Sequence, residues 1–463
     1  MGSVERNEAG RGVSRRGFLR AAGAAGVVGA GLAAGPIIMA ADEGPPINVA
    51  LIGCGTQGRV LTEQAVKIPD IRFMAVVDIW PFSQRYASRR LKAYGHDVNI
   101  YTDYRDVLEK EKDLQAVIVA TPDWMHAEHT IACLGAGLHV YCEKEMSNDF
   151  AKARAMVLAA RKTGNLLQIG HQRRSNPRYQ YAKETYLDET HMLGPITQVY
   201  GQWNRSMRTS QPRGFPSGHP IDQATLDRYG YADAFEFRNW RWFRKYGGGP
   251  IADLGSHQID VFGWFLGSRP TSVYADGGTG FFDRYEWHDN VYALYHFETP
   301  EGTVRALYET FSTTSARSYY ESFMGTDGTL TISENAGQCR VYAEGTLPRG
   351  PNDRHAWQKW ADKGYIVEVP KDNKEEVEAP KTMGEELLAM YRSPPPVEYV
   401  FGVEVEDNLH MAHLANFFDA VRGKGKLNCP AEVGYETAVQ VLKVHKALES
   451  QGPVAFREED FKA

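Results

Sequence analysis

The feature that most constrains this 463-residue chain is a glycine-rich turn between a predicted strand and a predicted helix, at residues 47–58. An apolar run before the turn is typical of a buried strand. The glycines fit the pattern G-x-G-x-x-G, in which they form a tight turn, admit a diphosphate and let the helix pack on the strand. The residues expected to hold a dinucleotide diphosphate are Gly53, Gly55, Thr56, Gln57 and Gly58.

A second apolar run ends in Asp78, about 20 residues after the last glycine. A carboxylate at this place binds both ribose hydroxyls of NAD and repels the 2′-phosphate of NADP. Arg85 and Arg89 follow closely and could reach that phosphate, so NADP stays open. A nucleotide-free α/β turn is the alternative interpretation of the glycines.

The composition excludes some classes of protein. With 43% hydrophobic residues the chain can bury a sizeable core. The formal net charge of -6 argues against a nucleic-acid surface. The five cysteines are scattered and form no C-x-x-C pair, so no metal site and no disulfide framework is expected.

The first 41 residues predict a targeting segment. Arg15 and Arg16 precede an Ala/Gly-rich, mildly apolar run from 21 to 41, which is the pattern of a Tat signal. The run is poorly apolar for a spanning helix, so no membrane span is expected in the mature chain. Cleavage is expected near Ala40 or Ala41, and a retained anchor is the alternative. The expected location is the periplasm.

Strands and helices alternate from residue 47 to residue 170, which predicts a doubly wound parallel sheet of the Rossmann type. The expected domains are 42–170, a dinucleotide-binding domain, and 171–463, an α/β domain with an open, mostly antiparallel sheet. Ligands bind beyond the carboxyl ends of parallel strands. Candidate residues at this edge are Gly53, Asp78, Thr121, Glu143, Lys144, His171 and Gln172.

Two long segments interrupt the second domain. Residues 204–249 are rich in arginine, glycine and aromatics, and such a stretch inside a domain is functional or disordered; the aromatics favour function. Residues 346–396 predict a surface excursion.

Lys144 follows a predicted strand, beside the expected nicotinamide position. Its ammonium group can donate to a substrate hydroxyl oxygen and stabilise a developing alkoxide. The alternative is a surface ion pair with Glu143 or Glu145.

Asp253 and His257 lie four residues apart at the start of a predicted amphipathic helix, and so share one face. Histidine has a pKa suited to accepting an alcohol proton, and the carboxylate could orient the ring. A helix-capping Asp with a packed His is equally compatible with the spacing. His171 is a rival base.

Tryptophans and arginines interleave in and around the segment 204–249. Aromatic faces stack on sugars, and arginines bind hydroxyls or carboxylates, although core aromatics with solvated arginines would give the same pattern. The residues concerned are Trp203, Trp240 and Trp242, with Arg205, Arg238, Arg241 and Arg244.

Taken together, these stretches resemble the glucose–fructose oxidoreductase / inositol dehydrogenase (Gfo/Idh/MocA) family. The matching residues are Gly53 to Gly58, Thr121-Pro122-Asp123 with His126, Glu143-Lys144, Gly170 to Arg174 with Asn176-Pro177, and Asp253-x-Gly255-x-His257. The resemblance implies hydride transfer between NAD(P) and a sugar or cyclitol hydroxyl. It also implies an oligomer formed through the open sheet. The family usually has proline after Glu-Lys, where this chain has Glu145.

Carried over to this chain, the resemblance assigns roles residue by residue. Lys144 polarises the reacting hydroxyl, His257 is the base and Asp253 supports the site. Beyond the glycine turn and Asp78, the expected cofactor contacts are Thr121, Pro122, His126, Glu143, Lys144 and Gln172, and the expected substrate contacts are His171, Arg173, Trp203, Trp240 and Arg241.

The expected function is therefore a periplasmic NAD(P)-dependent oxidoreductase acting on a sugar, glycoside or cyclitol. Exported members of the resembling family hold the dinucleotide tightly, so a tightly bound NAD is expected here. Two alternatives stay open: an NAD-dependent glycosidase working by transient oxidation and elimination, and a non-catalytic sugar-binding relative.

Overall fold

The computed structural model describes residues 45–207, 213–347, 355–370, 382–384, 387, 393–404 and 409–463. The predicted signal, 1–41, lies outside these residues. Residues Asp42–Ala463 form one compact unit that holds two sheets. Among the helices described, none has both the length and the apolar character needed to cross a membrane.

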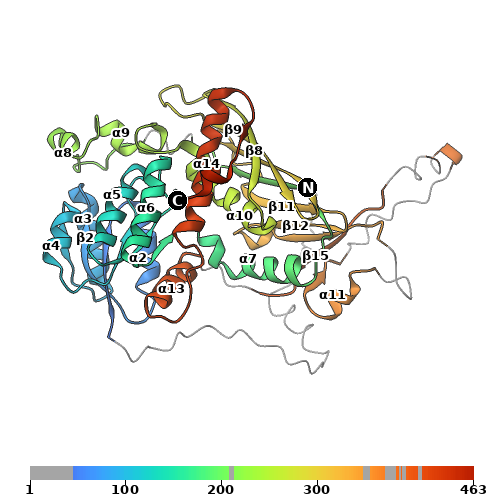
Figure 1. The fold of residues 1–463 in the computed structure, drawn as a ribbon, viewed down its shortest axis with the longest axis horizontal. Helices are drawn as coiled ribbons and strands as arrows, with labels where there is room; N and C mark the ends of the chain where they lie inside the picture. Colours follow the sequence, from blue (N-terminus) through green and yellow to red (C-terminus); the bar gives the residue numbers. More distant parts are fainter. Residues whose placement is uncertain are drawn as a thin grey trace, which may run out of the picture. The chain divides into compact units, whose positions relative to one another are not determined.

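The first sheet is parallel and doubly wound, as the alternation of strands and helices predicted (Figure 1). Its strands lie in the order β3-β2-β1-β4-β5-β6, which reverses at β1. The crevice for a ligand therefore lies at the carboxyl ends of β1 and β4. The strands are β1 (Ile47–Ile52), β2 (Ile71–Val77), β3 (Asn99–Tyr101), β4 (Ala116–Val119), β5 (His139–Cys142) and β6 (Leu167–Ile169).

Helices connect these strands, as the alternation predicted. They are α2 (Thr56–Ala65), α3 (Pro81–Ala93), α4 (Tyr104–Lys110), α5 (Asp123–Gly135) and α6 (Phe150–Thr163). The strand β3 at the edge of the sheet ends at Tyr101. That strand has three residues, too few to show a period. Asp103 then caps α4 by accepting a hydrogen bond from the Arg105 N–H at 3.0 Å.

The second sheet has ten strands in the order β14-β15-β13-β12-β11-β7-β10-β9-β8-β16. All neighbours are antiparallel except β7 and β10, which confirms the mostly antiparallel sheet. The strands are β7 (Ile196–Asn204), β8 (Pro270–Gly278), β9 (Asn290–Thr299), β10 (Gly302–Phe311), β11 (Tyr319–Gly325), β12 (Gly328–Ile332), β13 (Arg340–Ala343), β14 (Ile366–Glu368), β15 (Val397–Phe401) and β16 (Val454–Ala455).

The surface excursion predicted at 346–396 is partly wrong. In the described part of this range the chain forms α11 (Gln358–Asp362) and the edge strand β14, whose Ile366 is buried. β14 pairs with β15, far along the chain. Strands of three to five residues carry almost no periodic signal, so pairing with remote partners decides them.

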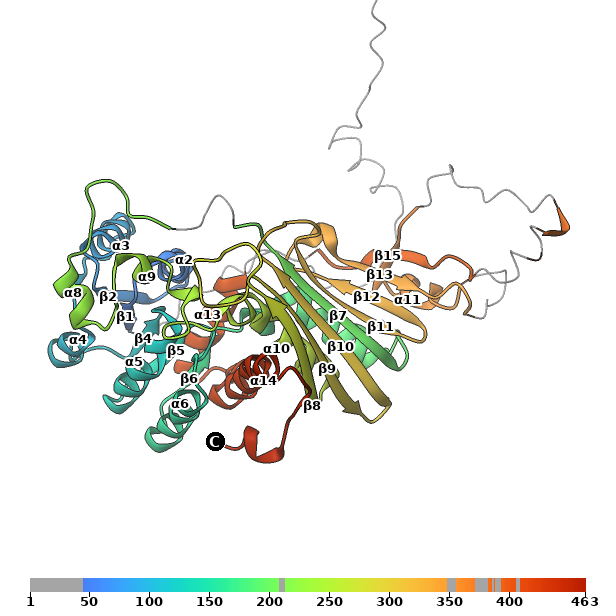
Figure 2. The same cartoon turned by 90° about the horizontal axis from the view of Figure 1, so that it is seen from above.

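Helices cover one face of the second sheet (Figure 2). They include α7 (Pro177–Tyr181) with the π-helical continuation Ala182–Glu189, α10 (Ser256–Leu266), and α14 (Ala431–Ser450). On the other face Tyr274 and Tyr292 are exposed by 45% and 44%. One face of this sheet is therefore open, as expected.

The helix α14 joins the two halves of the unit. Its first half, with Ala438 and Val439, packs in the core of the first sheet, and its second half, with Val441 and Val444, packs in the core of the second. α13 (Leu409–Val421) packs against α2. The end of the predicted second domain therefore completes the core of the first sheet.

Candidate active site

A cleft of about 730 Å³ runs along the carboxyl edge of the first sheet. Residues of the segment 204–249 and of the turn before α10 line its opposite side. Most of the residues predicted for the site line this cleft: Gly53, Gly55, Thr56, Gln57, Asp78, Thr121, Pro122, Glu143, Lys144, Gln172, Trp203, Trp240, Arg241, Asp253 and His257.

The glycine turn has the geometry that a diphosphate needs. Gly53 has φ +97°, and a Cβ atom there would lie 2.6 Å from the Ala120 backbone. A Cβ atom at Gly58 would lie 2.0 Å from the Gly53 carbonyl oxygen, so this glycine lets α2 pack on the turn. At Gly55 a Cβ atom would meet nothing within 4 Å, which leaves space over the N-terminus of α2. The turn therefore fits a dinucleotide.

Asp78 is held at the end of β2 by two backbone groups. Its Oδ2 accepts from the Cys54 N–H and its Oδ1 from the Trp80 N–H, both at 2.8 Å. Burial raises the pKa of Asp78 to about 6, although these hydrogen bonds oppose the shift. Each carboxylate oxygen keeps a lone pair for a ribose hydroxyl.

Residues 213–249 cover this end of the cleft. Trp80 donates its indole N–H to the His219 carbonyl at 3.0 Å and packs edge-on against Phe215 and Phe237. The Arg238 guanidinium lies 4.8 Å above the Trp80 ring. The segment forms the short helices α8 (Gln223–Arg228) and α9 (Ala234–Arg238) and so covers the adenosine end of the expected site.

Lys144 follows β5 and reaches across the cleft. Its Nζ donates to the Asp253 carbonyl oxygen. The alternative of a surface ion pair does not hold, because the Glu143 carboxylate accepts from the Tyr141 hydroxyl and Glu145 is buried, with Oε1 bonded to the Met146 N–H. The peptide bond after Lys144 is cis, at the position where the resembling family usually has proline.

Asp253 lies in a π-helical turn, Ile251–Gly255, that precedes α10. Arg241 Nε donates to Oδ1 at 2.8 Å and Arg205 Nη2 to Oδ2 at 3.1 Å. Burial alone would raise the pKa of Asp253, but the charges of Arg241, Lys144 and Arg205 hold it well below its usual value. Asp253 is therefore ionised: its carboxylate pairs with two guanidinium groups, its main-chain carbonyl accepts from Lys144, and it does not cap the helix.

His257 lies on the first turn of α10 and is 5% exposed. Burial and the charges of Lys144 and Arg173 lower its pKa well below the usual value, so the ring is neutral. Its Nδ1 has no hydrogen-bond partner among the described residues. A neutral imidazole beside an ammonium group can accept a proton from a hydroxyl.

Trp203 holds the His257 ring from one side. The two ring centroids are 5.5 Å apart at 30°, and Tyr319 stacks on Trp203 at 4.5 Å. Because other rings lie against it, Trp203 orients the imidazole, and its role as a sugar-stacking face stays a prediction. Trp242 is buried in an aromatic cluster, so for this residue the core interpretation is correct.

Four predicted site residues do not line the cleft: Gly58, His126, His171 and Arg173. His126 places its ring nitrogens 2.7 Å from the Thr121 carbonyl and 2.8 Å from the Glu145 carbonyl, so it joins two loops of the site from behind. His171 is buried, and burial lowers its pKa to about 4. A base that contacts substrate has to reach the cleft, and His257 does so.

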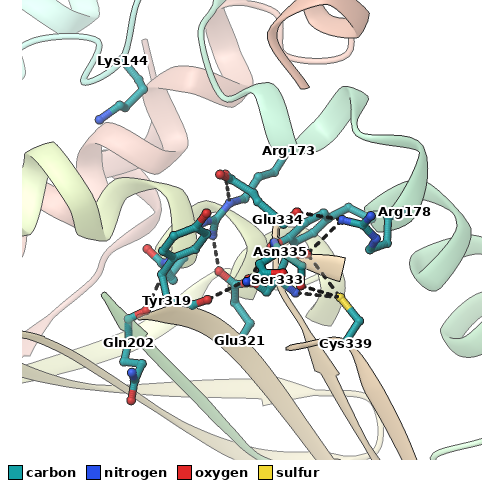
Figure 3. A network of polar contacts seen from close by, with 12 residues as sticks. Lys144, Arg173, Arg178, Gln202, Tyr319, Glu321, Ser333, Glu334, Asn335 and Cys339 are labelled. Atoms are coloured by element: carbon teal, nitrogen blue, oxygen red, sulfur yellow. Dashed lines mark hydrogen bonds and ion pairs between the residues drawn. The ribbon is translucent and has the colours of Figure 1, made fainter. Parts of the chain in front are cut away.

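Arg173 is buried between two carboxylates (Figure 3). Its Nε donates to Glu334 at 2.8 Å, and its Nη1 pairs with Glu321. Arg178 also binds the Glu334 carbonyl, at 2.9 Å. The guanidinium of Arg173 therefore holds Glu334 at the cleft wall, and the predicted substrate contact does not fit its position.

The sequence did not single out several residues of the wall. Glu334 comes from the loop after β12, and His410 from α13, where its Nε2 lies 3.2 Å from Gln57 Nε2. Arg213 comes from the segment 204–249, and the high arginine content of that segment was the only feature of the sequence that pointed to it. Within the described part of the chain no three His, Cys, Asp or Glu side chains could hold a metal, and all five cysteines are buried.

Two family models match the chain. The model described as "Oxidoreductase family, NAD-binding Rossmann fold" matches residues 47–171, and the model described as "GFO/IDH/MocA C-terminal domain" matches residues 221–331. Together they cover just over half of the chain.

Curated relatives match part of the chain. The inositol 2-dehydrogenase of Rhizobium meliloti (strain 1021) is 27% identical over 229 residues, which are 50% of this chain and 58% of the relative. The D-glucoside 3-dehydrogenase of Escherichia coli (strain K12) is 29% identical over 224 residues, 48% of this chain and 54% of the relative. The chain spans less than two thirds of the length of these relatives.

Solved structures share the fold over almost the whole chain. A levoglucosan dehydrogenase in complex with NADH has a TM-score of 0.64 at 17% identity, covering 89% of this chain and 99% of the other. The WlbA dehydrogenase of Bordetella pertussis, in complex with NADH and UDP-GlcNAcA, has a TM-score of 0.59 at 18% identity, with the same coverage.

Proposed function

Because the chain belongs to the Gfo/Idh/MocA oxidoreductase family, we propose that it transfers a hydride between NAD and a hydroxyl group of a sugar, glycoside or cyclitol. One observation carries the proposal. Lys144 and His257 line the same cleft as the glycine turn and Asp78. An ammonium donor, a neutral base and a dinucleotide site in one cleft are the components of alcohol oxidation.

Each side chain of the proposed site has its own role in the reaction. When bound, the nicotinamide supplies the hydride acceptor. The Lys144 ammonium donates to the reacting oxygen and stabilises its developing negative charge. His257 accepts the hydroxyl proton, and Trp203 keeps its ring in place. Asp253 positions Lys144 through its carbonyl oxygen.

We assign NAD rather than NADP as the cofactor, on the ground of Asp78. Asp78 lines the cleft, and its two oxygens are fixed by backbone N–H groups. An ionised carboxylate there repels a 2′-phosphate.

A tightly held cofactor is part of the proposal. Aromatic side chains of the segment 204–249 pack on Trp80 and cover the adenosine end. A dinucleotide enclosed in this way leaves slowly, which suits the Tat export proposed from Arg15 and Arg16, because Tat carries folded proteins. Mass spectrometry of the denatured, as-purified protein should find NAD, and an empty protein would contradict tight binding.

The reaction itself is tested by mixing the purified protein with NAD and a panel of neutral and acidic sugars, glycosides and cyclitols while recording NADH absorbance. Lys144→Met should lower kcat by about 10³-fold, by loss of oxyanion stabilisation. The matched control is Lys162→Met, exposed on α6. No reduction of free or bound cofactor with any compound would refute the proposal.

A glycosidase that oxidises and re-reduces its substrate is the second candidate, favoured by the same covered cofactor site. It would release an aglycone from a glycoside without accumulating NADH. Retained activity in Lys144→Met would instead favour a role for the protein that does not involve chemistry at this lysine.

The open face of the second sheet is proposed as the contact between copies of the chain. Tyr274 and Tyr292 are exposed on it. Tyr274→Glu should lower the mass measured by light scattering if the oligomer forms there.

A further inference from the structure

At the substrate end of the cleft, the carboxylates of the described residues leave several guanidinium N–H groups without a hydrogen-bond acceptor. Arg205, Arg213 and Arg241 all line the cleft. Two of them share Asp253, and each uses a single nitrogen for it: Nε of Arg241 at 2.8 Å and Nη2 of Arg205 at 3.1 Å. The remaining N–H groups of these two guanidinium groups have no hydrogen-bond acceptor among the described residues.

Arg213 has no counter-ion of its own in the described part of the chain. Its hydrogen bonds are those of its main chain, whose N–H donates to Asn239 Oδ1 at 2.8 Å and whose carbonyl accepts from Asn239 Nδ2 at 3.2 Å. Burial and the charges of Arg241 and Arg205 lower its pKa, and Asp253 opposes this shift only in part. Asn239 thus holds the main chain of Arg213, whose guanidinium lies near those of Arg205 and Arg241.

The other carboxylates of this end are already engaged. Glu143 accepts from the Tyr141 hydroxyl and from the Lys144 N–H, both at 3.3 Å. Asp123 is buried and faces the Gly248 N–H at 3.4 Å. Glu334 is bound by Arg173. Burial lowers the pKa of Arg241, and the charges of Asp253, Asp123 and Glu143 more than offset this effect. In the described part of the chain, however, neither Asp123 nor Glu143 accepts a hydrogen bond from the three arginines, so their free N–H groups can still bind an anion.

We propose that Arg205, Arg213 and Arg241 bind a carboxylate or phosphate group of the substrate, which makes the substrate an acidic sugar or cyclitol. This inference rests on the proposed function of the same cleft. Guanidinium groups bind such oxyanions through paired N–H donors, and Asp253 keeps two of the three forks in place. The anion would be anchored near the hydroxyl that faces Lys144 and His257.

The phosphates of the dinucleotide are the other source of the same chemistry. Arg238 continues the row of arginines towards Asp78, whose negative charge opposes the burial-driven fall in the Arg238 pKa. Arg241 and Arg205, however, are tied to Asp253 at the Lys144 end. The test therefore has to separate substrate binding from cofactor binding.

Calorimetric titration of the protein saturated with NADH measures binding without turnover, so its result does not depend on whether any sugar is oxidised. The ligands are matched pairs: D-glucuronate with D-glucose, D-galacturonate with D-galactose, and D-glucose 6-phosphate with D-glucose. Malonate probes the anion site alone. At least one acidic member should bind tenfold or more tightly than its neutral partner, and malonate should compete with it.

Arg213→Gln should remove most of this preference, because its guanidinium has no structural partner to lose, while the affinity for NADH stays unchanged. The control is Arg154→Gln, exposed on α6. If Arg213→Gln weakens NADH binding instead, the arginine serves the cofactor and the proposal is wrong. It is equally wrong if neither malonate nor any acidic sugar binds better than the neutral sugars. Failure of oxidation with intact acid binding would refute the proposed reaction only.

Discussion

The two sides of the cleft are built in different ways. The side formed by the first sheet offers backbone groups and glycines, from Gly53 to Gly58, and one fixed carboxylate, Asp78. The opposite side offers charged side chains, such as Arg241 and Asp253. A common ligand can be bound by main chain at the ends of strands, whereas a particular substrate needs particular side chains.

The two sides also differ in the substitutions that they tolerate. A Cβ atom at either Gly53 or Gly58 would lie within 2.6 Å of backbone that has no room to move. On the opposite side Arg205 and Arg241 are 41% and 31% exposed, so a shorter side chain there leaves room for water. Substitutions on the first side should therefore weaken cofactor binding, and those on the second side should change catalysis or the choice of substrate and leave cofactor binding intact.

The largest effect is expected for Gly58→Val. The new side chain would collide with the Gly53 carbonyl, 2.0 Å from its Cβ, and force α2 away from the turn. Bound dinucleotide should be lost almost completely, measured by mass spectrometry after denaturation. Gly135→Val, where a Cβ atom meets nothing within 4 Å, is the matched control. Normal cofactor content in Gly58→Val would contradict the expectation that the first side of the cleft tolerates no side chain at this glycine.

Arg173→Met should be the next largest change, and it tests the wall that Glu334 forms. Removing the guanidinium leaves Glu321 buried without its partner, which destabilises a protein by about 3–5 kcal/mol. Urea unfolding should show this fall in the free energy of unfolding. The double variant Arg173→Met with Glu321→Gln should recover part of it; no recovery would mean that the pair is not the cause.

His257→Asn should lower kcat by about 10²–10⁴-fold through loss of the base. NADH affinity should not change, since the cofactor contacts are on the other side. In the unaltered protein the pKa of His257 lies well below its ordinary value of 6.5, so the base is ready well below neutral pH. The acid limb of kcat/KM should accordingly fall below pH 6.5. A limb at or above 6.5 would contradict the buried, neutral ring.

The smallest change concerns Asp78, whose pKa is raised to about 6. Above this pH the carboxylate is ionised and repels a 2′-phosphate; as pH falls through 6 it takes up a proton and the repulsion is lost. The preference for NAD over NADP should therefore shrink about tenfold between pH 7.5 and pH 5, which corresponds to about 1.4 kcal/mol. Asp78→Asn should have the smaller preference at both pH values. If Asp78→Asn shows the same dependence of the cofactor preference on pH, the titrating group is the 2′-phosphate of NADP and not Asp78.

The first side of the cleft could be predicted because its signals are local. Strand, glycine turn and helix occupy the continuous stretch 47–65, and Asp78 directly follows the next strand of the same sheet. Parallel strands bring their carboxyl ends to one edge, so Lys144 and Gln172 could be placed without coordinates. The predicted pair Asp253 and His257 also reached this cleft, since a single helix start carries both.

The second side could not be predicted to the same depth. Arg173 and His171 follow a strand of the first sheet just as Gln172 does, yet they point into the interior. Glu334 reaches the cleft only because Arg173 and Arg178 hold its loop from behind. The placement of Glu334 depends on contacts between segments more than 150 residues apart.

The sequence by itself determined the parallel sheet, its diphosphate turn and the acid at the ribose, because hydrophobic period and glycine spacing act over a few residues. Tertiary structure alone decided which side chains face the ligand beyond that edge. The charge and burial around a side chain depend on which elements pack against it. Asp253 lies beside three cations, and Arg173 is buried against Glu321, only because remote strands and helices come together around them.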